Sequence, residues 1–145
     1  MRVVINVAKQ EPGYKEAVET YVAKHAVRGM LLEYGIPSLV HYKTLERQQW
    51  RLRQVNPANV CCEVKAPVYD ESANTFTFTL IPRGPRRDAL EHLWATGMNV
   101  VINTRMVKNP KGGIARILSF DILSEDECKL MHAFAPLKNG TGVAA

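Results

Sequence analysis

The sequence predicts an α+β fold, a ferredoxin-like sandwich whose antiparallel sheet carries two main helices and is elaborated by extra strands. Stretches of alternating apolar residues indicate strands, and two segments with apolar residues at three- and four-residue steps indicate helices. They follow one another in the order strand, helix, strands, helix, strands. The chain has 145 residues, 46% of them hydrophobic, as is usual for one globular domain. We therefore expect a single domain over 1–137 and a polar tail over 138–145.

The first expected elements are a strand and a long helix. Apolar residues alternate over 3–7, and the Glu-Pro-Gly sequence at 11–13 ends this strand. From 14 to 34 apolar residues recur every three or four positions, until Gly-Ile-Pro at 35–37 interrupts the pattern. This spacing predicts a helix over 14–34, with His25 on or near its inner face as a buried structural histidine.

The middle of the chain has the composition of strands, with one ambiguous segment. Residues 38–43 and 60–68 are strand-like, and over 75–80 large apolar residues alternate with threonines, which predicts a strand buried on one face. The polar, basic segment 46–54 fits either an extension of the preceding strand or a short helix. As a strand, it would bury Trp50 and place its arginines on the opposite face.

The last third of the chain predicts a helix, two strands and a short helix. A helix is expected over 85–96, because proline stands at its first position and glycine follows its end, with Trp94 on its inner face. Residues 99–107 and 114–123 form the strands of a hairpin. A last helix over 125–134 would be capped by the serine that precedes it.

Charge and composition narrow the function classes. From Lys43 to Arg116 there are 12 Lys and Arg against 6 Asp and Glu, a net of +6, whereas the rest of the chain has −1. Such a field attracts nucleic acid or an acidic protein face in a salt-dependent way. The start of the sequence is too short and too alternating for a signal peptide, and the odd cysteine count argues against a secreted disulfide framework. We expect a cytoplasmic protein without a membrane span, in the host cytoplasm or the virion if a phage encodes it.

The motifs provide neither a metal site nor a catalytic site. Cys128 and His132 are four apart on an expected helix, but only one of the adjacent Cys61 and Cys62 can join them, which leaves three of the four ligands of a structural zinc. The sequence contains no nucleophile elbow, no zinc-protease motif and no phosphate-binding glycine loop. We therefore expect no metal, no cofactor and no enzymatic activity.

Basic residues gather in three candidate binding segments. Within 46–54, three arginines surround Trp50, which suits base stacking and phosphate contact, although a solvated edge strand would look the same. The arginines of 83–87 precede a helix, where their charge opposes the helix dipole unless a bound anion, an aspartate or an acidic partner offsets it. The lysines and glycines of 108–113 suit phosphate binding or a plain hairpin turn. The candidate nucleic-acid- or anion-binding residues are Arg47, Arg51, Arg53, Arg83, Arg86, Arg87, Lys108 and Lys111.

Three short stretches resemble the RegA translational repressors of tailed bacteriophages. They are Leu-Val-His-Tyr-Lys at 39–43, Arg-Arg-Asp at 86–88 opening a helix that ends at a glycine, and Ile-Leu-Ser-Phe at 117–120 before a Lys-Leu pair. Their order is similar to that family's, whereas 56–84 has no counterpart. The resemblance implies a small protein that binds mRNA near start sites and blocks translation without a cofactor.

We expect a non-enzymatic, basic protein that binds RNA or single-stranded nucleic acid and acts as a translational regulator. The alternative is a phage-type structural or assembly protein, or an inhibitor, that acts through contacts with an acidic protein surface or with copies of itself. A third hypothesis, an enzyme, would place its active site near His41, Cys61 or His92, but no nucleophile pairs with a base in the sequence.

Overall fold

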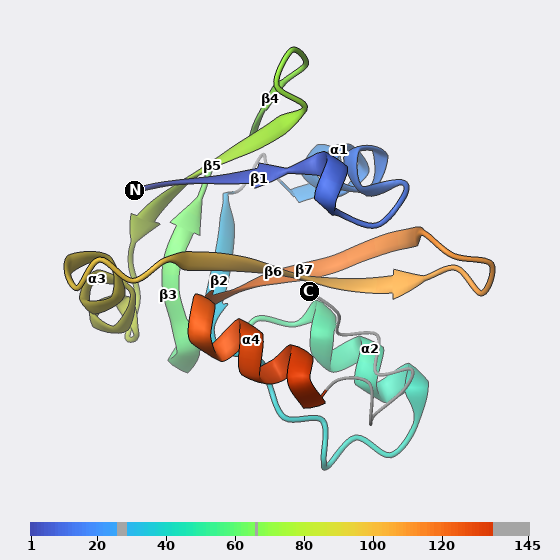
Figure 1. The fold of residues 1–145 in the computed structure, drawn as a ribbon. Helices are drawn as coiled ribbons and strands as arrows, with labels where there is room; N and C mark the ends of the chain where they lie inside the picture. Colours follow the sequence, from blue (N-terminus) through green and yellow to red (C-terminus); the bar gives the residue numbers. More distant parts are fainter. Residues whose placement is uncertain (26–28, 66, 135–145) are drawn as a thin grey trace.

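The computed structural model describes residues 1–25, 29–65 and 67–134, with side chains up to Leu130. These residues form one curled, mixed sheet with four α-helices around it (Figure 1). The strands are β1 (Arg2–Asn6), β2 (Met30–Tyr34), β3 (Val60–Val64), β4 (Val68–Asp70), β5 (Thr75–Pro82), β6 (Val100–Lys108) and β7 (Ile114–Ser124). The helices are α1 (Tyr14–His25), α2 (Leu45–Arg53), α3 (Arg87–Ala95) and α4 (Glu125–Phe134). The predicted polar tail, 138–145, lies outside the described residues.

The prediction of a ferredoxin-like sandwich is wrong. The sheet has seven strands in the order β1-β5-β3-β2-β7-β6, with β4 paired to β5, and it curls into a half-barrel rather than forming one layer under two helices (Figure 1). The pairing of β2 with β7 is parallel, whereas the other described pairings are antiparallel. Helices α1 and α2 both contact β7, and α4 packs against β6 and β7.

The main error lies in the helix that was predicted over 14–34. Helix α1 ends at His25, and residues 30–34 of the predicted segment form β2, which lies between β3 and β7 in the middle of the sheet. Gly29 precedes β2 with φ +74, and a Cβ there would stand 2.6 Å from the carboxylate of Glu63. Helical spacing alone does not reveal this break, because alternating and helical patterns overlap in a short apolar run.

Two further segments differ from their predictions. Residues 38–43 form no strand, and the ambiguous segment that follows is helix α2, whose start is capped by Thr44 through a 3.2 Å bond from the Arg47 amide to its Oγ1. Trp50 on this helix is 49% exposed, so the strand interpretation that buried it is wrong. Trp94 is 45% exposed, although it was predicted on the inner face of its helix.

Other predicted elements are confirmed. Strand β5 buries Phe76 and Phe78 and turns its threonines outward, and β6 and β7 form the predicted hairpin. Helix α4 begins after Ser124, whose Oγ accepts from the Glu127 amide at 3.0 Å while the Glu127 carboxylate accepts from the Ser124 amide at 3.2 Å. This reciprocal pair is a capping box.

The core lies inside the curl of the sheet, under α1. The rings of Phe78 and Phe120 meet at 5.6 Å between centroids, and Tyr14 of α1 lies edge-on to Phe76. Tyr21 of α1 also meets Phe120 of β7 edge-on at 5.3 Å, so these aromatic contacts pack α1 against both β5 and β7. The surface hollow described below lies between this helix and this strand.

Candidate functional site

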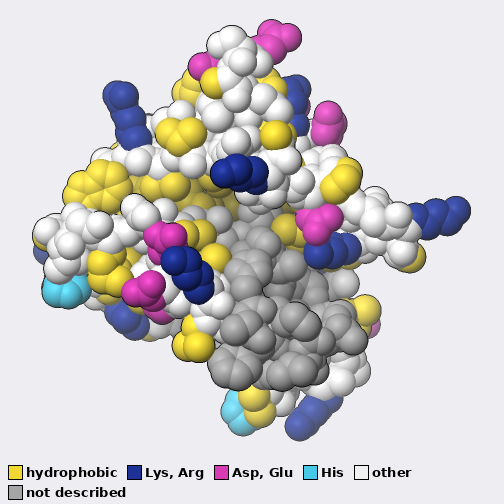
Figure 2. Space-filling view, viewed as in Figure 1, with side chains coloured by type: hydrophobic (Ala, Val, Ile, Leu, Met, Phe, Trp, Pro, Cys, Tyr) yellow, Lys and Arg dark blue, Asp and Glu magenta, His cyan; other side chains and the backbone are white. Residues whose placement is uncertain are grey.

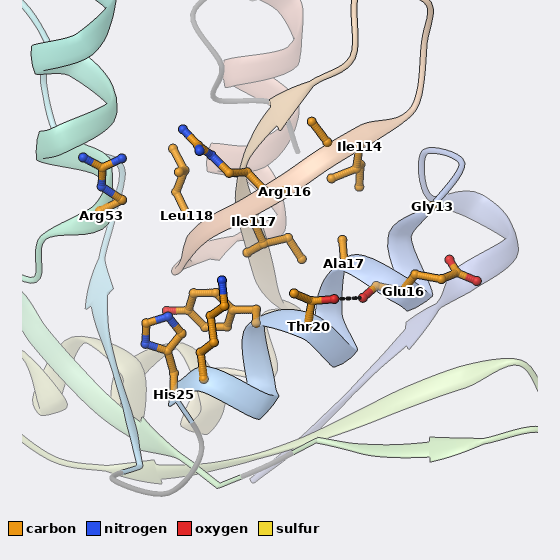
Figure 3. A pocket seen from close by; sticks show the side chains of 13 residues that line it. Gly13, Glu16, Ala17, Thr20, His25, Arg53, Ile114, Arg116, Ile117 and Leu118 are labelled. Carbon is orange, nitrogen blue, oxygen red and sulfur yellow. Dashed lines mark hydrogen bonds between the residues drawn. The ribbon is translucent and has the colours of Figure 1, made fainter.

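A groove lies between α1 and β7 and is bordered by the last residue of α2 (Figure 3). Its volume is about 570 Å³, within the range of small-ligand pockets. We call it the α1–β7 groove. Its lining residues are Gly13, Glu16, Ala17, Thr20, Tyr21, Lys24, His25, Arg53, Ile114, Ala115, Arg116, Ile117 and Leu118.

Helix α1 lines the groove with a polar stripe. Its inner face, around Val18, is buried in the core, whereas Glu16, Thr20 and Lys24 are exposed and follow one another at four-residue steps. Residues at this spacing lie above one another on a helix. The Thr20 hydroxyl donates to the backbone carbonyl of Glu16 at 2.9 Å, and the Lys24 ammonium is the positive group at the C-terminal end of the stripe.

Strand β7 reaches the groove because its pairing with β6 is irregular. Arg105 pairs with Ser119 and Met106 pairs with Ile117, so Leu118 is an extra, unpaired residue on β7. Ala115, nearer the hairpin loop, is a second extra residue of this kind. Such bulges bend a strand and re-aim its side chains. Arg116 is thereby exposed at the groove while Ile117 remains buried.

The charges in the groove are mostly positive. Lys24, Arg53 and Arg116 come from three different elements, and Glu16 is the one carboxylate in the lining. Arg116 donates from Nη2 to Oε1 of Gln49 on α2 at 2.9 Å. Among the described residues, none of the three cations forms an ion pair. Their charge is therefore available to an anionic ligand.

Two aromatic rings stand at the same groove. Tyr21 and His25 are stacked, with centroids 4.2 Å apart and planes 27° from parallel. Tyr21 is fixed from behind by the edge-on ring of Phe120 at 5.3 Å, whereas His25 is exposed. Burial raises the pKa of Tyr21, against the opposing effects of a hydrogen bond with Ser119 and the charge of Arg105, so its hydroxyl stays neutral at physiological pH.

Behind the groove lies a buried network of charged residues centred on Arg105, which is 0% exposed. Its Nε donates to Asp121 at 2.8 Å, and its Nη2 donates both to Asp121 and, at 3.3 Å, to Glu33. Its Nη1 donates to the carbonyls of Leu52 and Gln54 at 3.0 and 3.3 Å. Arg105 thus ties the C-terminal end of α2 to the sheet.

Glu33 completes the network from β2. It accepts from Arg51 at 3.1 Å, from the Asn56 amide at 3.2 Å and from the Asn59 side chain at 3.3 Å. Two arginines and two carboxylates balance one another, so the network is neutral and its charges are hydrogen-bonded, as buried charges need to be. Because the network holds the Arg51 side chain and the carbonyls of Leu52 and Gln54, it positions the backbone of Arg53 beside the groove.

The two carboxylates of the network have pKa values shifted in opposite directions. Burial raises the pKa of Asp121, and hydrogen bonding and charge from Arg105 offset only part of that effect. Burial also opposes ionisation of Glu33, but hydrogen bonds from Arg51 and Asn56 together with the charge of Arg105 outweigh it and lower the pKa. Glu33 thus interacts with two arginines, Arg51 and Arg105, whereas Asp121 interacts with Arg105.

The structure separates the three predicted basic segments. The arginines at the start of α3 already have partners: Arg83 lies 2.6 Å from Glu63, Arg86 stands over the Tyr34 ring at 5.2 Å, and Arg87 lies 3.9 Å from the neighbouring aspartate. They lie at α3, at the opposite end of the sheet from α1 (Figure 1). They do not join the groove.

The other predicted residues divide between structure and surface. Arg51 belongs to the buried network, Lys108 lies 3.1 Å from Glu11, and Arg47 and Lys111 are exposed. Of the eight candidates, Arg53 alone lines the α1–β7 groove.

The sequence analysis assigned no binding role to the other groove residues, Lys24, His25, Tyr21 and Arg116. Its prediction of a buried structural histidine at position 25 is wrong, because His25 is exposed. A signal for Arg105 and Asp121 was present, since a charged residue inside an otherwise apolar strand is unusual unless it is paired. The stripe on α1 was visible as polar residues at four-residue steps. Nothing in the sequence shows that this stripe faces β7, because the contact depends on the curl of the sheet.

The cysteines and histidines do not form a site in the described part of the chain, where no cluster of metal-ligating groups occurs. Cys61 and Cys62 are fully buried with their Sγ atoms 4.0 Å apart, and the hydrogen bond between them and burial raise the pKa of Cys62. Buried thiols of this kind are unreactive. Cys128 is half-buried on α4, and the His132 side chain lies outside the described side chains.

Comparison of the chain with protein-family models, curated proteins and solved structures gives no match. Among the described residues, no helix has the length and apolar character needed to cross a membrane.

Proposed function

We propose that this protein binds RNA or single-stranded nucleic acid without catalysing a reaction, and that the α1–β7 groove is its binding site. The observation that carries the proposal is the meeting of Lys24, Arg53 and Arg116 in one groove without ion-pair partners among the described residues. Phosphate contacts from Lys and Arg supply most of the affinity of proteins for nucleic acid. A cytoplasmic location, in a host cell or virion if a phage encodes the protein, belongs to the same proposal.

The shape of the groove favours a flexible strand over a duplex. Side chains from a helix wall and a strand wall line it, and its volume of about 570 Å³ accommodates nucleotides rather than a double helix. The stacked Tyr21 and His25 add aromatic surface beside the cations, a combination that single-strand-binding proteins use. An mRNA ligand and a role in translational regulation, as the resemblance to RegA implies, are consistent with this chemistry.

The test is fluorescence-anisotropy binding of labelled 12-nucleotide RNA and DNA strands at several salt concentrations. The double variant Arg53→Ala/Arg116→Ala should weaken binding and should lower the slope of log affinity against log salt by about 1.4, since each phosphate contact to a single strand contributes about 0.7. The control, Arg2→Ala/Lys65→Ala, removes the same charge from exposed positions outside the groove and should keep the wild-type slope.

Equal losses in the two variants would show that net charge alone drives binding, and this result would overturn the groove as the site. An absence of binding by the wild-type protein at low salt would overturn the proposed function itself.

A second candidate function, assembly or inhibition through protein contacts, is favoured by one observation. Val4, Trp94 and Met98 are exposed and line a hollow beside β1, which is an edge strand. Figure 2 shows hydrophobic side chains gathered on this face, between β1 and α3. Apolar patches of this kind occur at protein interfaces. Concentration-dependent self-association in light scattering, together with a lack of oligonucleotide binding, would favour this second function.

A further inference from the structure

Trp50 stands on the outer face of α2 between two arginines. Arg47 and Arg53 are three residues before and after it, a spacing that makes each of them its neighbour on the helix surface. Both arginines are exposed, neither forms an ion pair among the described residues, and the Trp50 side chain is 49% exposed. The Trp50 ring is thus partly exposed to solvent, with an arginine on each side of it along the helix.

The Trp50 ring is supported from the protein side. Tyr42 lies next to it, with centroids 6.4 Å apart and planes 38° from parallel. The Tyr42 carbonyl accepts from Nε2 of Gln48 at 3.0 Å, which holds the preceding segment against the helix. The ring is therefore backed by a second aromatic residue and presents its remaining surface outward.

This surface continues into the α1–β7 groove. Arg53 belongs to both, because it follows Trp50 on α2 and also lines the groove. Gln49, the residue before Trp50, accepts the hydrogen bond from Arg116 of β7 at 2.9 Å. A chain of phosphates that contacts Arg116 and Arg53 in the groove would reach Trp50 as it leaves over α2.

We propose that Trp50 is a stacking platform for an unpaired base of a single-stranded nucleic acid, with Arg47 and Arg53 contacting the phosphates on either side. This inference rests on the proposed function and specifies its ligand, because a base inside a duplex is not free to stack on a side chain. Stacking on an aromatic ring tolerates any base, so Trp50 selects single strands over duplexes rather than one sequence over another.

The chain offers a matched pair of tryptophans for the test. It contains two, Trp50 on α2 and Trp94 on α3, and they are similarly exposed, at 49% and 45%. In the full-length variant Trp94→Phe, Trp50 is the sole indole fluorophore, and in Trp50→Phe it is Trp94. Each variant is titrated with a 12-nucleotide uridine RNA and with a 12-base-pair RNA duplex, and circular dichroism checks that it is folded.

The single strand should quench the fluorescence of Trp94→Phe, whereas the duplex should not. Trp50→Phe should show little quenching by either. In anisotropy titrations Trp50→Ala should weaken binding of the single strand about tenfold, Trp50→Phe should weaken it less because a ring remains, and the salt slope should stay that of the wild type.

Two results would overturn the role of Trp50 and leave the proposed function standing. In the first, the single strand binds but leaves the fluorescence of Trp94→Phe unchanged, and Trp50→Ala binds it with wild-type affinity. In the second, the single strand and the duplex quench the fluorescence of Trp94→Phe equally. If neither nucleic acid binds the wild-type protein at low salt, the proposed function fails and the role of Trp50 fails with it.

Discussion

The end of α2 and the start of α3 both carry clustered arginines, but in different settings. At α2, the Arg51 side chain is 12% exposed and pairs with the buried Glu33, and Arg53 lines the groove without an ion-pair partner among the described residues. At α3, Arg83 pairs with Glu63 at the surface and Arg86 lies over an aromatic ring. The number of arginines in a segment therefore does not determine the charge it offers to a ligand. Their local partners determine it.

The largest effect on stability should come from the network beneath α2. Arg105→Ala removes a fully buried cation and leaves Asp121 and Glu33 without their shared partner. Breaking a buried ion pair in this way costs about 3–5 kcal/mol of unfolding free energy. Urea denaturation measures it, with the exposed Arg2→Ala as a control that should change stability by less than about 0.5 kcal/mol. A loss under about 1 kcal/mol for Arg105→Ala would contradict a role of the network in holding α2.

The same network should make stability depend on pH through Glu33. Its pKa is lowered in the folded protein, so its contribution is complete above the unfolded-state value of about 4.3 and is lost as the pH falls through the folded-state pKa. Glu33→Gln should therefore destabilise the protein at pH 7 and differ less from wild type at pH 3. Burial, the largest cause of the raised pKa of Asp121, is present in both proteins, whereas the smaller contribution from the charge of Glu33 is lost in Glu33→Gln. Denaturation curves at pH 7, 5 and 3 test this, and a constant difference over that range would refute it.

The smallest effect should come from the surface pair at α3. The Arg83 side chain is 66% exposed, so solvent screens its 2.6 Å ion pair with Glu63. Arg83→Ala should lower the unfolding free energy by at most about 1 kcal/mol. Thermal unfolding at low and high salt measures this, and the difference from wild type should shrink as salt increases. A loss comparable to that of Arg105→Ala would mean that the two regions do not differ as their burial indicates.

The predictions for the fold succeeded where local signals agreed with tertiary packing. Strand β5, the hairpin of β6 and β7, and the capped helix α4 each combine a clear period with a turn or cap residue. The predictions failed where the same apolar residues fit both the helical spacing and the two-residue alternation of a strand. The stretch that forms β2 matches helical spacing, and only its place between β3 and β7 makes it a strand.

The candidate site was predicted only in part, since Arg53 was named and its neighbours in the groove were not. The rest of the groove comes from α1 and β7, about ninety residues apart in the chain, and from bulges that no pattern of hydrophobicity reveals. The sequence did show that Trp50 lies among arginines, a pattern that suits base stacking and phosphate contact. Its exposure was not, because a strand would bury a residue that a helix turns outward.

The sequence by itself determined the mixed composition of helices and strands, the positive charge of the middle of the chain and the alternating faces of β5. These properties follow from neighbouring residues and from composition. Only the tertiary structure decided which basic residues are paired, which are buried and which meet in a groove. The reason is physical, since the curl of the sheet and the pairing of Arg105 with carboxylates on β2 and β7 bring together residues that are distant in the chain.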